Sequence, residues 1–87
     1  MHFVYILRCA DASLYIGETD DVESRVGRHR EGRACACTAS RRPVELVYLE
    51  AHSTHLEARR RERQLKGWTR RKKEALVAGD LAQLKRS

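Results

Sequence analysis

Apolar and polar residues follow one another in patterns that change several times along this chain. Residues 2–9 are almost continuously apolar and rich in β-branched and aromatic side chains, which is typical of a central strand buried on both faces. Residues 10–13 form a short polar break, and residues 14–18 return as a second strand. The chain therefore opens with a predicted β-hairpin.

A third strand is expected over residues 44–50, directly after Pro43. Alternation along this segment places Val44, Leu46 and Tyr48 on one face. Together with the hairpin, this strand predicts a small three-stranded sheet.

The helices are predicted mainly from their capping signals. Asp20 is the expected N-cap of the first helix, with Glu23 completing a capping box, and Thr54 with Glu57 repeats this pattern in the second. Glycines mark the helix ends. The predicted helices cover residues 20–32, 54–67 and 68–79, with a short last helix over 80–86 and a loop over 33–42.

The order strand, strand, helix, strand, helix, helix predicts an α+β domain, in which a three-stranded antiparallel sheet is flanked by helices. A chain of 87 residues has room for one hydrophobic core. We therefore expect a single domain over residues 1–87, with its core within residues 2–78.

The hairpin loop decides whether Tyr5 and Tyr15 can serve one site. Side chains alternate along strands, so a two-residue loop over 11–12 would place the two tyrosines on opposite faces. A three-residue loop over 10–12 would place them on the same face. The sequence alone leaves both loops open.

The chain carries a formal net charge of +6, which changes the range of expected partners. The charge favours a polyanionic partner, nucleic acid before membrane, although it also fits a basic surface that is simply solvated. No apolar run approaches the roughly 20 residues that a membrane helix needs. The first residues contain neither a basic n-region nor a cleavage site, so we expect a cytoplasmic protein without membrane contact.

Three cysteines are present, and an odd number argues against a disulfide framework. Cys35 and Cys37, with Cys9 and a histidine, could in principle bind zinc. The single C-x-C pair does not match the spacing of structural zinc sites, so we expect no zinc and thiols that pack in or near the core.

Several side chains together could support phosphodiester hydrolysis, which needs a proton acceptor, a hard metal cation and a positive charge at the phosphate. Arg25 and His29 are four residues apart on the first helix, so they reach the same patch. Tyr5, Tyr15 and His29 are the available proton acceptors, and Glu62 could hold Mg²⁺.

Each of these residues also has an explanation that involves no chemistry. A tyrosine in a strand usually packs with its hydroxyl at the rim, and a basic pair on a helix is usually solvated. Glu62 could simply pair with Arg59 or Lys66 at helical spacing. Taken one at a time, these signals are weak.

Their combined order and spacing nevertheless resemble the GIY-YIG nuclease family, in particular its small stand-alone bacterial members. The resemblance extends over about three quarters of the chain and implies a three-stranded antiparallel sheet flanked by helices. It also implies cleavage of nucleic-acid phosphodiesters with one divalent metal ion. The segments that carry it are Phe3-Val4-Tyr5, Tyr15-Ile16-Gly17, Arg25, His29 and Glu62.

The same resemblance implies a role for each residue. Tyr5 and Tyr15 take the two signature tyrosine positions, and one of them helps to activate the water. Arg25 holds the scissile phosphate and His29 assists proton transfer. Glu62 anchors one Mg²⁺ or Mn²⁺ ion. The resemblance leaves the general base unassigned, and Gly17 is expected to let the backbone approach the site closely.

The chain also departs from the family pattern. Phe3-Val4 replaces Gly-Ile, and Glu18 follows Gly17 where some relatives carry a basic or small residue. An acid there could repel phosphate or tune a neighbour. Cys37 stands where similar sequences often place an aromatic residue before threonine, which affects substrate contacts expected from residues 33–42.

A basic surface is expected to neutralise phosphates without reading the base sequence. Trp68 could stack on a base or fill the space between two helices. The expected nucleic-acid contacts are Arg28, Arg33, Arg41, Arg42, Lys66, Arg70 and Lys73.

These features predict a metal-dependent endonuclease that acts on DNA in preference to RNA, directed by branched, damaged or single-stranded structure rather than by sequence. The alternative is a nucleic-acid-binding module that keeps the nuclease fold with little or no catalysis. A third reading is a role in RNA processing or binding. A homodimer or a partner protein could supply specificity.

Overall fold

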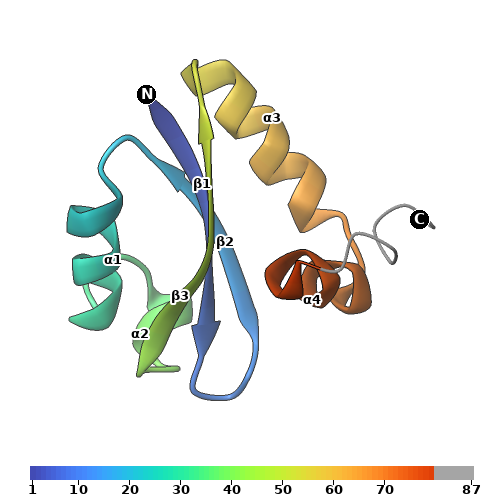
Figure 1. The fold of residues 1–87 in the computed structure, drawn as a ribbon. Coiled ribbons are helices and arrows are strands. Elements are labelled where there is room, and N and C mark those ends of the chain that lie inside the picture. Colours follow the sequence, from blue (N-terminus) through green and yellow to red (C-terminus); the bar gives the residue numbers. More distant parts are fainter. Residues whose placement is uncertain (80–87) are drawn as a thin grey trace.

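The computed structural model describes residues 1–79 (Figure 1). The helix expected over residues 80–86 lies outside these described residues. The strands are β1 (His2–Cys9), β2 (Leu14–Thr19) and β3 (Val44–His52), and the helices are α1 (Val22–Arg30), α2 (Ala36–Ala39), α3 (His55–Lys66) and α4 (Arg70–Ala78).

The three strands form one antiparallel sheet in the order β2-β1-β3, so the predicted α+β fold is confirmed. Helices α1 and α2 lie on one face of the sheet, and α3 and α4 lie on the other (Figure 1). The central strand β1 is therefore covered on both faces, which explains its continuous apolar pattern.

Alternate residues of β1 belong to two separate cores. Towards α3 and α4 the buried cluster consists of Val4, Ile6, Ile16, Ala58, Leu65 and Leu76. Towards α1 the buried cluster consists of Tyr5, Leu7, Cys9, Val26 and Val44. The sheet thus separates the molecule into two sides, and the side that carries α1 contains Tyr5.

The hairpin contains a three-residue loop. Cys9 N–H donates to the carbonyl of Ser13 over 2.9 Å, and Ala12 adopts a left-handed conformation with φ of 69°. A left-handed last residue is typical of three-residue hairpin loops. The odd loop length places Tyr5 and Tyr15 on the same face, which the sequence had left open.

The prediction that Val44, Leu46 and Tyr48 share one face is wrong. The β1–β3 register shifts midway, which leaves Val47 as an extra residue in β3. Such a bulge moves all later side chains to the other face. Val44 and Leu46 therefore pack on the α1 side, whereas Tyr48 packs against the cluster under α3 and α4. The strand also runs further than expected, to His52.

The predicted N-cap of the first helix is also wrong by one residue. The side chain of Asp21, not Asp20, accepts a hydrogen bond from the backbone N–H of Ser24 over 3.1 Å. Asp21 N–H itself donates to the hydroxyl of Thr19 over 3.1 Å, which keeps Asp20 within the turn that follows β2. Thr54 caps α3, as predicted, whereas Thr69, expected within the helix over 68–79, is the N-cap of α4.

The segment 33–42, expected to be a loop, contains the short helix α2. A helix of one turn is too short to show hydrophobic periodicity, so the sequence pattern could not reveal it. Within residues 1–79, no helix is both long and apolar enough to cross a membrane.

The strained turn residue gives a testable prediction about stability. Replacing Ala12 by glycine removes the steric cost of a positive φ, so Ala12→Gly should raise the free energy of unfolding by about 0.5–1 kcal/mol. Chemical denaturation would measure the change. The matched control Ala10→Gly, in the same loop but without a positive φ, should lower stability slightly. Equal effects of the two substitutions would contradict this account.

Candidate active site

Three aromatic side chains from three different elements meet on the α1 side of the sheet. The ring centroids of Tyr5 (β1) and Tyr15 (β2) lie 6.4 Å apart. The ring of His29 (α1) lies 5.8 Å from Tyr5 and 4.9 Å from Tyr15. The fold therefore brings these three predicted site residues into one cluster.

Gly17 makes room for this cluster. It is the cross-strand partner of Tyr5, and a Cβ atom at this position would lie 2.5 Å from Cζ of the Tyr5 ring. Its backbone has no unusual φ, so the glycine is needed for space rather than for conformational freedom. Any larger residue would displace the Tyr5 ring from its place beside His29.

A chain of buried hydrogen bonds fixes the histidine. The hydroxyl of Tyr5 lies 2.9 Å from Nε2 of His29, and Nδ1 lies 2.8 Å from the hydroxyl of Thr38. All three side chains are fully buried. The Thr38 hydroxyl also donates to the carbonyl of Cys35 over 3.5 Å. We therefore assign the ring proton to Nδ1, so that Nε2 accepts from Tyr5.

Burial keeps this network uncharged. Burial lowers the pKa of His29, and the positive charge of Arg25 lowers it further, so the imidazole is neutral at pH 7. Burial also raises the pKa of Tyr5, and the nearby Arg25 only partly offsets this rise. Burial and the neighbouring Cys35 and Glu62 raise the pKa of Tyr15 to about 12. Both phenols are therefore protonated at pH 7 in the free protein.

Arg25 and Glu62 act electrostatically on the cluster from two different helices. Arg25 lies one turn before His29 on α1, and its charge acts on His29 and on both tyrosines. Glu62 lies on α3, is half-buried, and acts on Tyr15. Its carboxylate pairs loosely with Nζ of Lys66 at 3.7 Å, which is the structural pairing the sequence had left open.

Two site residues were missed by the sequence analysis. Thr38, on α2, is the buried partner of His29. Cys35, just before α2, places its thiol 3.4 Å from the Thr38 hydroxyl. Burial raises the pKa of the Cys35 thiol, but hydrogen bonds from Thr38 and Tyr15 outweigh burial and lower it overall. The hydrophobic pattern of the sequence does not mark either residue. Their place in the site follows from contacts that form only in the folded chain.

The expectation that all three thiols pack in or near the core is wrong for one of them. Cys9 is buried in the cluster on the α1 side and Cys35 is half-buried, but Cys37 is exposed beside the guanidinium of Arg41, at 3.6 Å from its Nη1.

Glu18, the acid that departs from the family pattern, does not belong to this cluster. It is cross-strand partner to Val4 and therefore faces the α3 side, opposite to Tyr5 and Tyr15. Its carboxylate lies 3.2 Å from Nε2 of His55. Glu18 thus does not place a negative charge among the tyrosines.

The basic residues predicted to contact nucleic acid lie on several elements. Arg28, Arg33, Arg41 and Arg42 are exposed on α1 and around α2, and Lys66 and Arg70 are exposed on α3 and α4. Lys73 is half-buried. Several have acidic or carbonyl partners: Arg33 pairs with Glu31, Arg41 with Asp11, Arg42 with the carbonyl of Ala39, and Arg70 with Glu74 and the carbonyl of Ala12.

Trp68 is mainly a core residue. It packs against the buried cluster under α3 and α4, and the Lys72 ammonium lies 4.1 Å from its ring centroid. The guanidinium of Arg61 lies 5.2 Å from the same ring. These contacts favour the packing explanation over base stacking.

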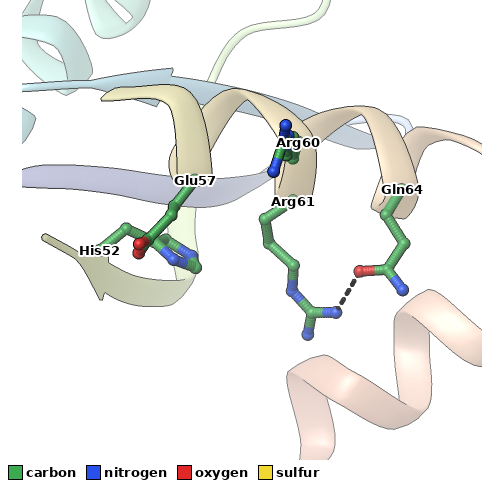
Figure 2. Close-up of a pocket in the computed structure, with 5 residues that line it drawn as sticks. All are labelled: His52, Glu57, Arg60, Arg61 and Gln64. Atoms are coloured by element: carbon green, nitrogen blue, oxygen red, sulfur yellow. Dashed lines mark hydrogen bonds between the residues drawn. The ribbon is translucent and has the colours of Figure 1, made fainter. Parts of the chain in front are cut away.

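A separate open hollow lies between α3 and the end of β3 (Figure 2). None of the predicted catalytic residues lines it. Arg61, which enters this hollow, already donates to Gln64 over 2.8 Å and to Glu50 over 2.8 Å. The residues that line the hollow are His52, Glu57, Arg60, Arg61 and Gln64.

Several known proteins are similar to this chain. Residues 1–75 match the family model described as the GIY-YIG catalytic domain. The chain is 49% identical over 76 residues to a UPF0213 protein of Staphylococcus aureus strain Mu3, covering 87% of this chain and 93% of that protein. The UPF0213 protein of strain Mu50 matches with the same values.

A solved structure is also similar. The solution NMR structure of a UPF0213 protein from Bacillus halodurans shares 43% sequence identity, with a TM-score of 0.60. The match covers 91% of this chain and 84% of that one. Its similarity supports the three-stranded sheet and its flanking helices.

The buried neutral histidine predicts a pH dependence of stability. The pKa of His29 is lowered in the folded state below its ordinary 6.5, so the unfolded state binds a proton first as pH falls. The free energy of unfolding should therefore decrease as pH falls through 6.5 and level off below the folded pKa. Urea denaturation between about pH 8 and 5 would measure this.

The control for this prediction is His29→Gln. In this variant the free energy of unfolding should fall less as the pH is lowered, because the contribution of His29 is absent. The other histidines and the paired carboxylates remain in both proteins, so the difference between the two pH curves isolates His29. Parallel curves would show that His29 does not carry the dependence.

Proposed function

This chain belongs to the GIY-YIG catalytic domain family, whose members are generally endonucleases, and from that premise we propose that it is a divalent-metal-dependent endonuclease that hydrolyses phosphodiester bonds in DNA. The single observation that carries the proposal is the cluster of Tyr5, Tyr15 and His29 with the charges of Arg25 and Glu62 around it. A protein that only bound nucleic acid would not need this combination.

Within this proposal, Tyr15 is the phenol that faces the attacking water. The hydroxyl of Tyr5 is fully buried and already donates to His29, whereas Tyr15 is partly exposed and senses the charge of Glu62. Tyr5 and His29 hold the ring of Tyr15 in place from behind. Tyr15 would have to give its own proton to solvent before it could accept one from the attacking water, and the neutral His29 beside both phenols would assist that proton transfer.

The residues present fit the divalent ion that the family implies. The Glu62 carboxylate is 24% exposed, and among residues 1–79 its ion-pair partner is Lys66 at the loose distance of 3.7 Å, so its oxygens can bind a cation. Carboxylate oxygens suit Mg²⁺ and Mn²⁺. When bound, such an ion would supply positive charge at the phosphate and favour deprotonation of groups beside it.

Arg25 is proposed to hold the scissile phosphate. Its guanidinium is close enough to lower the pKa of both phenols, so it lies where negative charge would develop during hydrolysis. A phenol with a pKa near 12 becomes a useful base only when nearby cations favour its phenolate form. Arg25 and the bound ion would act together in that way.

Binding is proposed to come from the basic residues around α1 and α2, at the end of α3 and on α4. Such residues contact phosphates and do not distinguish base sequences. We therefore propose that cleavage is directed by the structure of the DNA rather than by its sequence, and that DNA is preferred over RNA. A homodimer or a partner protein would then supply any further specificity.

The alternative function is a nucleic-acid-binding module with little or no catalysis. One observation favours it: both phenols are protonated at pH 7, and Tyr5 is completely buried. The two functions differ in whether a divalent ion produces cutting as well as binding. A cleavage assay with parallel binding measurements separates them.

Removing the carboxylate charge of Glu62 should abolish cleavage but not binding. Glu62→Gln is expected to lower the cleavage rate of branched or single-stranded DNA in Mg²⁺ or Mn²⁺ by about 100-fold or more, because the cation loses its anchor. Glu57→Gln, an exposed acid on the same helix, is the matched control and should cut normally. Undiminished cutting by Glu62→Gln would place the metal elsewhere.

The two tyrosines should respond differently to loss of their hydroxyl groups. Tyr15→Phe should lower the cleavage rate by about 100-fold or more with little change in stability. Tyr5→Phe leaves Nε2 of the buried His29 without a donor, so it should also lower the free energy of unfolding by about 1–3 kcal/mol. Thermal unfolding and cleavage rates of both variants test the assignment. A greater stability loss in Tyr15→Phe would reverse it.

Binding should depend steeply on salt. Affinity for a short DNA duplex is expected to fall on the order of 1000-fold between about 50 and about 200 mM salt. The reason is that basic side chains that bind phosphates release the counterions of the DNA, and added salt opposes this release. Arg28→Gln should reduce the slope of log affinity against log salt by about one, whereas Arg60→Gln, in the hollow of Figure 2, should not. A flat salt dependence, or equal changes in both variants, would contradict the proposed surface.

A further inference from the structure

Three potential metal ligands from three elements meet on the side of the sheet away from the tyrosines. His2 is the first residue of β1, Glu18 lies near the end of β2, and His55 is the first residue of α3. One ligand atom from each side chain lies within 4.8 Å of the other two. Within residues 1–79 no second group of three such side chains comes as close.

The arrangement of these side chains is partly ordered already. The rings of His2 and His55 stack with centroids 4.6 Å apart and an interplanar angle of 19°. Nε2 of His55 lies 3.2 Å from a carboxylate oxygen of Glu18. His2 and Glu18 are half-buried, while the His55 side chain is 53% exposed and can rotate. Rotation of the exposed His55 side chain would allow the three ligand atoms to converge on one ion with metal–nitrogen bonds of about 2.0–2.1 Å.

The donor set decides which ions fit. Two imidazoles and one carboxylate are typical ligands of Zn²⁺ and of similar first-row ions, whereas Mg²⁺ and Ca²⁺ prefer oxygen ligands alone. Three protein ligands leave room for water in the remaining position. The site is thus chemically different from a single carboxylate anchor for Mg²⁺ such as Glu62.

The group of His2, Glu18 and His55 is also separate from Glu62 in space. Glu62 follows His55 by seven residues on α3, which corresponds to about 10 Å along the helix axis. Glu18 faces the opposite side of the sheet from Tyr15. Neither the tyrosines nor Arg25 takes part in this group of ligands.

From this geometry we infer a second metal site, formed by His2, Glu18 and His55, that binds one Zn²⁺ or similar transition-metal ion. The ion joins the start of β1, the end of β2 and the start of α3, which are distant in sequence. The three ligands come together only in the folded chain, so binding of the ion stabilises the folded state. The ion would thereby hold α3 against the sheet. The inference does not depend on the proposed nuclease activity.

The first test is thermal unfolding of the metal-free full chain with and without Zn²⁺. With free Zn²⁺ at about 100 times its Kd, the Tm should rise by about 10 °C or more, and calorimetric titration should give one ion per chain. The same concentration of Mg²⁺ should give no comparable shift. No Zn²⁺-dependent rise in Tm, or one ion per two chains, would overturn the inference.

Substitutions identify the ligands. Glu18→Gln keeps an oxygen that can accept a hydrogen bond from His55 but removes the negative charge. His55→Gln changes an exposed side chain. Both variants should fold and should lose most of the Zn²⁺-dependent rise in Tm. The double substitution Cys35→Ser and Cys37→Ser should keep the Zn²⁺ response, which would exclude binding of Zn²⁺ by these two thiols. A response that survived in His55→Gln, or vanished with the cysteines, would overturn the assignment.

One neighbouring histidine needs its own control. His52 is the cross-strand partner of His2, but its Nε2 is held 2.8 Å from the carboxylate of Glu50. His52→Gln should therefore retain the Zn²⁺-dependent rise in Tm. Loss of the response in this variant would show that His52 is a ligand and that the proposed set is wrong.

Discussion

The hydrogen bond between Tyr5 and His29 is the interaction on which the arrangement of the site depends. It joins the central strand to α1 inside a fully buried region, where an unpaired polar atom would cost about 1–3 kcal/mol. Loss of either side chain would leave the other with an unpaired polar atom in the core. Gly17 leaves space for the tyrosine ring, and Thr38 satisfies the other nitrogen of the histidine. Four elements are thereby fixed around one pair of atoms.

This constraint also sets the electrostatics of the free protein. Burial keeps His29 neutral and both phenols protonated, although the chain as a whole is strongly basic. The surface charge attracts polyanions, while the buried cluster carries no charge of its own. The charges of Arg25 and Glu62 nevertheless act on its tyrosines. In the free protein the cluster therefore contains protonated phenols rather than a preformed phenolate.

Much of the fold was predictable from the sequence, because it rests on local signals. The apolar run of β1, the turn before β2 and the cap Thr54 act within a few residues, and each predicted its element correctly. The bulge at Val47 was not predictable, since it depends on how β3 pairs with β1. Thr38 was missed for a similar reason: its partner lies nine residues away across two helices. Both features depend on contacts between separate elements, which local sequence patterns do not reveal.

Strand β2 shows how one segment can serve two sides of a thin sheet. Tyr15 points towards α1 and the tyrosine cluster, whereas Glu18 points towards α3 and its histidine partner. An acid directly after Gly17 would repel phosphate if it lay among the tyrosines. Because alternation places Glu18 on the other face, its charge does not lie among them. The departure from the family pattern at this position therefore bears on the α3 side of the molecule and leaves the proposed chemistry of the tyrosine side intact.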